Sequence, residues 1–208
     1  MARCAPLQLP ERLTRAASLA CARIDPADRG PHDGAAAVTL WSVVAPVQPA
    51  FRIEPLLAHP QHVPFVAGVV YREFWASVSG GLTEEYLTRA FGGHAEPGRV
   101  LKSWLALEKD EPLGCVHLID HDDDTLPSLY PWLAAMVVVP GRRGQGIGSA
   151  LVRALLRDAR AMGFQRVWFG TDGPGFYERL GARRQLQRST TFWTMVFELE
   201  LTGPPLSG

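Results

Sequence analysis

The sequence predicts a mixed α/β domain. Strand-like and helix-like patterns follow one another in the order strand, two helices, three strands, helix, strand, helix, two strands. In addition, residues 132–139 form an unbroken apolar run, as expected for a strand at the centre of a sheet, and a glycine-rich turn and a helical pattern follow it. With 47% hydrophobic and 20% charged residues, a chain of 208 residues can bury a core.

The individual elements are predicted from alternation, helical spacing and capping residues. Thr83 precedes Glu84 and Glu85 and is therefore expected to start a helix. The predicted elements are, in order, a strand at 51–54, helices at 60–76 and from Thr83, strands at 100–107, 113–119 and 132–139, a helix at 147–162, a strand at 167–169, a short helix at 175–180, and strands at 184–187 and 192–201.

The ends of the chain are predicted to lie outside this domain. Residues 1–50 are rich in Ala, Arg, Pro and Gly and are expected to form a disordered N-terminal extension. The domain is expected to span residues 51–201, and residues 202–208 are expected to form a C-terminal tail. The first 24 residues are arginine-rich like a transit peptide, but an unstructured extension is the preferred interpretation.

Composition excludes several classes of function. Lys plus Arg equals Asp plus Glu at 21 each, so net charge gives no drive toward nucleic acid or an anionic membrane. No apolar run reaches the ~18 residues of a membrane helix. The three widely spaced cysteines fit neither a zinc site nor a disulfide framework, and no other cluster indicates a metal. A reducing cytoplasm is therefore the expected location, and a homodimer is left open.

The turn after the central apolar run has the features of a phosphate-binding loop. Pro140 ends the run, and a basic turn with Gly144, Gly146 and Gly148 leads into the helix. N–H groups at a helix start lack intrahelical partners, the helix dipole favours an anion there, and glycines allow the backbone to approach closely. A Rossmann loop would need a glycine where Ser149 stands, and the Gly-Lys-Ser/Thr of a nucleotide P-loop is absent.

The spacing Arg143-x-x-Gly146-x-Gly148 resembles the pyrophosphate loop of the GNAT family of N-acetyltransferases. The segments PWLAAMVVVPGRRGQGIGSALV and FYERLGA also resemble family motifs in their order and spacing. The resemblance covers roughly residues 51–201 and is strongest over 130–182. It implies the GNAT fold, which is a mixed, mostly antiparallel sheet flanked by helices, with acetyl-CoA as the acetyl donor.

By this resemblance, the amides from Arg143 or Gly144 to Ser149 hold the pyrophosphate of acetyl-CoA, and the backbone of Met136 and Val138 binds the pantetheine arm and the acetyl carbonyl. Gly170 stands where many members have an asparagine that orients CoA, and Thr171 is the expected substitute. The expected cofactor-binding residues are Met136, Val137, Val138, Arg143, Gly144, Gln145, Gly146, Ile147, Gly148, Ser149 and Thr171.

The resemblance also implies that Tyr177 is the general acid that protonates the departing thiolate. A phenol with a pKa of ~10 can donate to a thiolate whose conjugate acid has a pKa of ~8.5. The alternative is a half-buried aromatic that packs the short helix on the sheet. The central strand contains no carboxylate, so the general base stays unassigned, and the candidates are Glu73, His117, Asp120, His121 and Asp122.

The acceptor is expected to be the primary amine of a small molecule with an apolar or aromatic body. Tyr71, Trp75, Trp132 and Trp168 lie on elements expected to surround it, although packing explains each of them individually. Residues 122–124 are expected to form a solvated loop, with a cation-binding lip as the alternative. Two other functions are weighed: acetylation of a protein N-terminus or lysine, and acyl-CoA binding without catalysis.

Overall fold

The computed structural model describes residues 50–94, 99–190 and 192–199 of the chain. The predicted N-terminal extension, except residue 50, and the predicted C-terminal tail lie outside these described residues. In chain order the elements are β1 Arg52–Pro55, η2 Leu56–Ala58, η3 Pro60–His62, α2 Val63–Val70, η4 Tyr71–Trp75, α3 Glu84–Arg89, η5 Ala90–His94, β2 Val100–Glu108, β3 Glu111–Ile119, β4 Trp132–Val138, η6 Pro140–Arg142, α4 Ile147–Ala161, β5 Arg166–Thr171, α5 Pro174–Glu178, β6 Arg183–Gln187 and β7 Trp193–Glu198.

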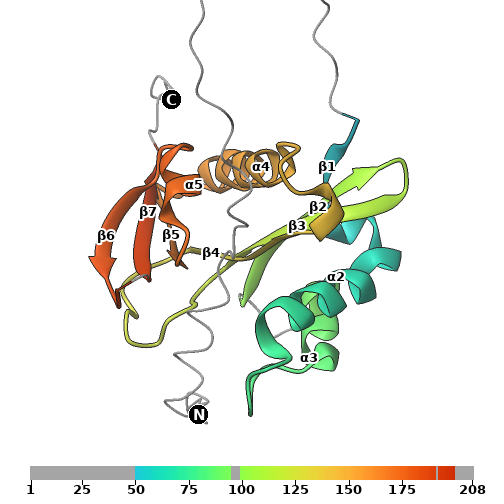
Figure 1. Ribbon diagram of the computed structural model, residues 1–208, viewed down its shortest axis with the longest axis horizontal. Helices are drawn as coiled ribbons and strands as arrows, with labels where there is room; N and C mark the ends of the chain where they lie inside the picture. Colours follow the sequence, from blue (N-terminus) through green and yellow to red (C-terminus); the bar gives the residue numbers. More distant parts are fainter. Residues whose placement is uncertain (1–49, 95–98, 191, 200–208) are drawn as a thin grey trace, which may run out of the picture.

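The strands form one seven-stranded sheet within the described residues, in the order β1-β2-β3-β4-β5-β7-β6. Every neighbouring pair is antiparallel except β4 and β5, which are parallel. Helices α4 and α5 lie on one face of the sheet, and α2 and α3 lie on the other (Figure 1). The predicted mixed, mostly antiparallel sheet flanked by helices is therefore confirmed.

The two faces of the sheet carry separate apolar clusters because side chains alternate along each strand. In β2, Trp104 packs toward α4, whereas Leu105 and Leu107 pack toward α2 and α3. Both faces of β2 are covered from Trp104 to Leu107, and this part of the strand is therefore continuously apolar. In α4, Leu151 and Leu155 are buried, as the helical spacing predicts.

Local signals explain where several helices begin and end. The side chain of Thr83 accepts a hydrogen bond from Tyr86 N at 3.1 Å, which confirms it as the N-cap of α3. The single helix predicted over 60–76 is instead a 3₁₀ turn, the α-helix α2 and a π-helical turn, η4.

None of the helices in the described residues combines the length and apolar character that a membrane crossing needs.

Strand β4 contains a bulge at the centre of the sheet. From Cys115 to His117, β3 advances two residues, while the partners in β4 run from Val137 to Ala134, three residues. The extra residue is accommodated at Ala135, whose φ is 47°. Near this bulge β3 approaches β4 so closely that a Cβ on Gly114 would overlap the carbonyl oxygen of Val137.

Beyond this bulge, β4 has an open edge. In the part of the chain that the structure describes, the ladder between β4 and β5 has one register pair, which joins Trp132 at the start of β4 to Trp168, the third residue of β5. The two strands then separate, with α4 and α5 above them (Figure 1). The backbone of β4 that faces β5 is therefore available to a ligand that can pair with a strand.

Candidate active site

The glycine-rich turn forms an exposed loop at the start of α4. Gly144 and Gly146 have φ values of 73° and 80°, which a side chain would disfavour, and no atom lies within 4 Å of a Cβ built on either. Residues 144–146 are exposed, whereas Ile147 is buried in the core. The turn is thus anchored by one apolar residue while its backbone faces solvent.

Helix α4 begins without a side-chain cap among the described residues, because Gly146 is its N-cap. The first bond of the helix runs from Ala150 N to Gly146 O at 3.0 Å. The preceding amides of Ile147, Gly148 and Ser149 therefore have no acceptor within the helix. Uncapped amides at the positive end of a 15-residue helix suit the binding of an anion such as a phosphate.

The two arginines of this turn are held by carboxylates from other elements. Arg142 forms a bidentate pair with Glu108 of β2 at 2.6 and 2.8 Å. Its hydrogen bond is the main reason why the pKa of the Glu108 carboxyl lies below its ordinary value. Arg143 Nη2 lies 3.6 Å from Glu73 Oε2 of η4. The backbone amides, rather than these side chains, are therefore the ready anion ligands of the turn.

Val138 presents its backbone to the open edge of β4. Val139 N donates to Leu113 O of β3 at 2.9 Å, and backbone groups alternate in direction along a strand, so those of Val138 point the other way. Arg143 Nε donates to Val138 O at 3.0 Å. This contact places Arg143, and with it Glu73, beside the edge where the pantetheine arm is expected.

The start of α4, the bulged strand and α5 converge at one point. A Cβ on Gly148 would lie 3.4 Å from Phe176 of α5 and 3.6 Å from the sulfur of Met136. Tyr177 follows Phe176, and its ring lies 4.9 Å from that of Phe176 and 4.4 Å from that of Phe169. The structure therefore brings together three segments that the sequence predicted to share a site.

Tyr177 is fully buried, with 0% of its surface exposed. Its contacts with Phe169 and Phe176 account for much of its packing. Thr171 is also fully buried, and its hydroxyl accepts a hydrogen bond from Gly173 N at 3.0 Å. This contact closes the turn between β5 and α5.

The predicted aromatic residues surround the sheet face opposite α4. Leu133 and Val167 belong to the cluster beneath α4, so the adjacent Trp132 and Trp168 point to the other face, where they are register neighbours. Tyr71 and Trp75 lie on η4, which packs against that face of the sheet at β2 to β4. Two pairs of aromatic residues thus border the face from different sides.

The candidate bases occupy different environments. His117 is fully buried, its Nδ1 lies 2.7 Å from Ser103 Oγ, and its ring stacks on Phe91. Burial lowers the pKa of His117 to about 3, so the ring is neutral at neutral pH and is a weak proton acceptor. Glu73 keeps about a quarter of its side chain exposed beside Arg143. Of the two, Glu73 is the more accessible to a ligand.

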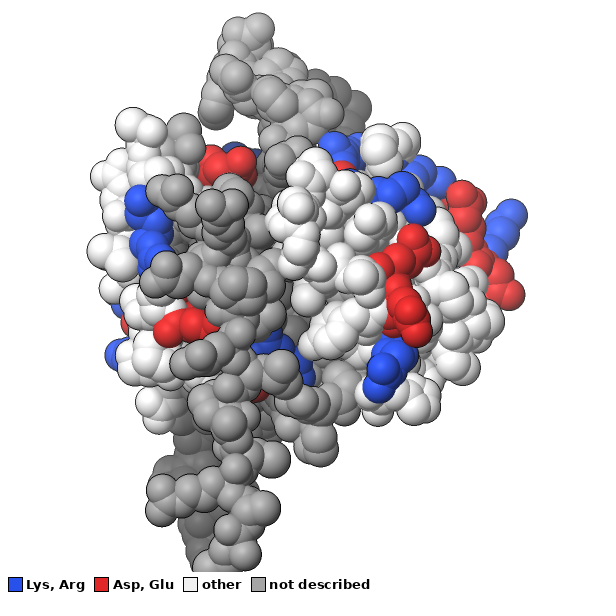
Figure 2. All heavy atoms as spheres, turned by 90° about the horizontal axis from the view of Figure 1, so that it is seen from below, with Lys and Arg blue, Asp and Glu red and all other residues white. Residues whose placement is uncertain are grey.

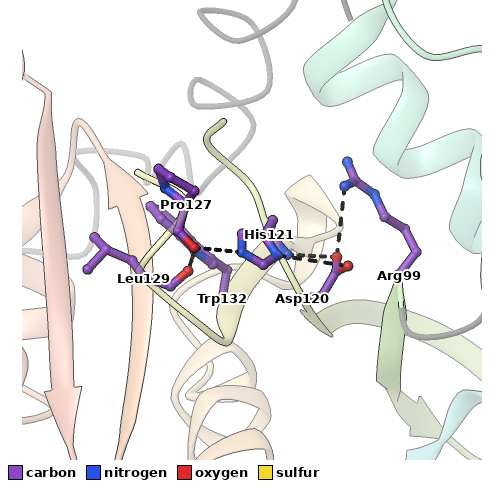
Figure 3. Close-up of polar contacts among 6 residues, drawn as sticks. All are labelled: Arg99, Asp120, His121, Pro127, Leu129 and Trp132. Atoms are coloured by element: carbon purple, nitrogen blue, oxygen red, sulfur yellow. Dashed lines mark hydrogen bonds and ion pairs between the residues drawn. The ribbon is translucent and has the colours of Figure 1, made fainter. Parts of the chain in front are cut away.

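Asp120 and His121 shape the loop that follows β3 (Figure 3). Asp120 lies 3.8 Å from Arg99, and its carboxylate accepts a hydrogen bond from His121 N at 2.7 Å. His121 Nε2 lies 3.0 Å from Pro127 O and must carry the proton of that hydrogen bond. The loop is only partly solvated, because Asp123 is buried and paired with Arg188, while Asp124 is exposed.

Charge on the face seen from below is mixed (Figure 2). Basic and acidic side chains alternate with uncharged ones on the described part of this face, and neither sign gathers into an extended patch. The described residues also contain no group of three or more His, Cys, Asp or Glu side chains arranged for a metal ion.

Two features of the site had no signal in the sequence. The bulge at Ala135 depends on the register between β3 and β4, and alanine is not a residue that favours positive φ. The Asp123–Arg188 pair joins two loops that are distant in sequence. A residue pattern reports local periodicity, so neither feature can be read from it.

Comparison with known proteins gives a consistent result. Residues 69–182 match the model of the acetyltransferase (GNAT) family. The chain is similar to N-acetyltransferase 8B of Homo sapiens, with 32% identity over 101 residues that cover 46% of this chain and 44% of that protein. It is similar to mycothiol acetyltransferase of Nocardia farcinica (strain IFM 10152), with 35% identity over 100 residues that cover 48% of this chain and 30% of that protein.

The fold is similar to that of Rv2747 from Mycobacterium tuberculosis, which was solved in complex with CoA. The TM-score is 0.54 and the identity 19%, with 72% of this chain and 99% of that chain covered. The matched stretch spans less than half the length of either curated relative above.

Proposed function

The chain belongs to the acetyltransferase (GNAT) family, and on this premise we propose that it transfers an acetyl group from acetyl-CoA to the primary amine of a small molecule. The observation that carries the proposal is the convergence of the turn before α4, the bulge of β4 and Tyr177 of α5. An anion site, a strand edge that lacks a neighbouring strand and a proton donor are groups that suit transfer from a CoA thioester.

The residues of the chain have separate roles in this proposal. The amides of Ile147, Gly148 and Ser149 bind the pyrophosphate, and the backbone of Met136 and Val138 pairs with the pantetheine arm and the acetyl carbonyl. The amine nitrogen bonds to the carbonyl carbon, the C–S bond breaks, and Tyr177 Oη donates its proton to the departing thiolate. The proton that the amine loses passes to a base, which in turn restores the proton of Tyr177 through solvent.

We assign the base to Glu73. Its partner Arg143 donates to Val138 O, so the carboxylate lies close to the edge of β4 where the pantetheine arm is expected. The neutral, buried His117 is the weaker candidate, and Asp120 and His121 are engaged in the contacts that hold their own loop. An amine of low pKa would need the least help from this base.

The small-molecule acceptor is supported by the aromatic residues and by the mixed charge of the surface. Trp132 and Trp168 lie side by side on the face opposite α4. Trp132 is fully buried, whereas Trp168 is partly exposed and can contact an apolar body. One similar protein is named mycothiol acetyltransferase.

A non-catalytic acyl-CoA-binding module is the second candidate. The complete burial of Tyr177 favours it, because packing alone explains a buried phenol and no role in proton donation is needed. The experiment that separates the two candidates measures CoA release from acetyl-CoA over a panel of small amines and peptides, together with binding of acetyl-CoA. Binding with CoA release on small amines supports the proposed transferase. Binding without release on any amine supports the module, and release on peptides alone supports a protein acetyltransferase.

A further inference from the structure

The short turn after β4 brings a cationic side chain back to the end of that strand. Pro140 begins η6, in which Arg142 N donates to Val139 O at 2.9 Å and Arg143 N donates to Pro140 O at 3.3 Å. These bonds close the turn, and the side chain of Arg143 therefore lies beside Val138, five residues earlier in the chain.

The guanidinium of Arg143 is fixed by two contacts from different elements. Its Nε donates to Val138 O at 3.0 Å, and its Nη2 lies 3.6 Å from Glu73 Oε2 of η4. The side chains of Arg143 and Glu73 are only 28% and 26% exposed, so water and salt screen their attraction weakly. A charged donor also makes a stronger hydrogen bond than a neutral amide does. Arg143 is therefore held firmly on the carbonyl of Val138.

This carbonyl lies on the open edge of β4. The N–H and C=O groups of one residue point to the same edge of a strand, and Val139 N is bonded to Leu113 O of β3, so Val138 faces away from β3. On that side, the described residues give β4 one register pair with β5, at Trp132, far from Val138. A charged side chain on an unpaired edge prevents another strand from pairing there. Arg143 thus covers the backbone acceptor that a strand-like ligand would need.

We propose that Arg143 is a latch on the open edge of β4, and that the pantetheine arm of acetyl-CoA must displace its Nε from Val138 O in order to pair with the strand. The amides of the arm can donate to this carbonyl in place of the guanidinium. The latch therefore lowers the affinity for acetyl-CoA through the pantetheine arm and not through the pyrophosphate. The inference rests on the proposed acetyl transfer and adds a residue that restricts the entry of the donor.

The test compares two ligands, with and without the pantetheine arm, on the full-length protein. Adenosine 3′-phosphate 5′-diphosphate keeps the pyrophosphate of CoA and lacks the arm. Arg143→Met keeps an aliphatic side chain and removes every donor of the guanidinium. Calorimetry without any amine gives the Kd of each ligand, so turnover does not enter the result.

The readout is the Kd of the nucleotide divided by the Kd of acetyl-CoA. In Arg143→Met we expect this ratio to rise ~10-fold, the scale of one hydrogen bond made by a charged group. The lost positive charge weakens the binding of both ligands through the pyrophosphate that they share, and it cancels in the ratio.

The matched control is Arg142→Met. Arg142 is the neighbouring arginine of the turn and is 27% exposed, but its side chain pairs with Glu108 of β2 instead of the edge of β4. Its substitution removes the same charge and should leave the ratio as in the wild type. If Arg143→Met does not fold, Glu73→Gln keeps the guanidinium, loosens its second contact and should raise the ratio by a smaller factor.

An unaltered or lower ratio in folded Arg143→Met would overturn the latch, because the arm would then pair with Val138 beside Arg143 or use Arg143 as a ligand. An equal rise in Arg142→Met would also overturn it, since the effect would belong to the turn as a whole. Acetyl transfer would stand in both cases. No binding of acetyl-CoA to the wild type would overturn the proposed function and the latch together.

Discussion

Replacement of Gly146 by valine is expected to lower the stability of the protein and to weaken its stabilisation by acetyl-CoA. Gly146 has a φ of 80° at the N-cap of α4, and no atom lies within 4 Å of a Cβ built there. The cost of the valine is therefore conformational rather than steric in the ligand-free protein. A left-handed residue costs ~1–2 kcal/mol, and a β-branched side chain makes this conformation more unfavourable still.

Gly141 provides the matched control for this substitution. It lies in the same surface segment, its added Cβ also meets no atom within 4 Å, and its φ is outside the left-handed range. Gly141→Val and Gly146→Val restrict the unfolded chain to the same degree, so that contribution cancels in the comparison. The difference in their free energies of unfolding, measured by urea denaturation, should be at least ~1–2 kcal/mol, with Gly146→Val the less stable.

The cofactor response should separate the two variants further. Acetyl-CoA at one fixed concentration, a hundredfold the Kd of the wild type, should raise the free energy of unfolding of the wild type and of Gly141→Val by ~2.7 kcal/mol. If residue 146 leaves the left-handed region, the peptide plane that carries the Ile147 amide turns away from the anion site. Gly146→Val should therefore gain much less from acetyl-CoA. An equal gain in both variants would refute the assignment of this turn to the pyrophosphate.

Three further outcomes are expected. Tyr177→Phe should lower kcat by roughly 10²–10⁴ with little change in acetyl-CoA affinity, and steady-state kinetics with unaltered kcat would reduce Tyr177 to packing. Glu73→Gln should lower kcat/KM at neutral pH, whereas the control Glu108→Gln, which also removes the partner of an arginine of the turn, should not. Equal losses of kcat/KM in both variants would mean that both carboxylates only hold the turn in place. Burial raises the pKa of Asp122 to about 7; Arg99 opposes this shift and Asp123 adds to it. The stability linked to the Asp122 carboxyl is therefore present below its unfolded pKa of ~3.9 and is lost as pH rises through about 7. Asp122→Asn should therefore stabilise the protein at pH 8 and leave it unchanged near pH 4, as denaturation at both pH values would reveal.

Elements with strong local signals were predicted correctly. The apolar run of β4, the cap at Thr83 and the helical spacing of α4 each depend on neighbouring residues, and the structure confirms all three. The glycine pattern at 144–148 likewise marked a turn with positive φ at two of its glycines. Such signals are local because they arise from backbone sterics and from which face of one element is buried.

The environment of each candidate group could not be predicted in this way. Both arginines of the turn lie beside carboxylates from β2 and η4, and His117 is enclosed by residues of β2 and η5. The charge state of a side chain depends on its burial and on the charges around it, which come from segments far away in sequence. The residue type alone could therefore nominate a base but not rank the candidates.

The sequence by itself determined the type and order of the elements, the position of the glycine-rich turn before α4 and the family to which these motifs belong. The tertiary structure alone decided the bulge at Ala135, the separation of β4 from β5 and the pairing of Asp123 with Arg188. The first group follows from interactions within a few residues along the chain. The second follows from strand register and from contacts between loops, which are set only when distant segments pack against one another.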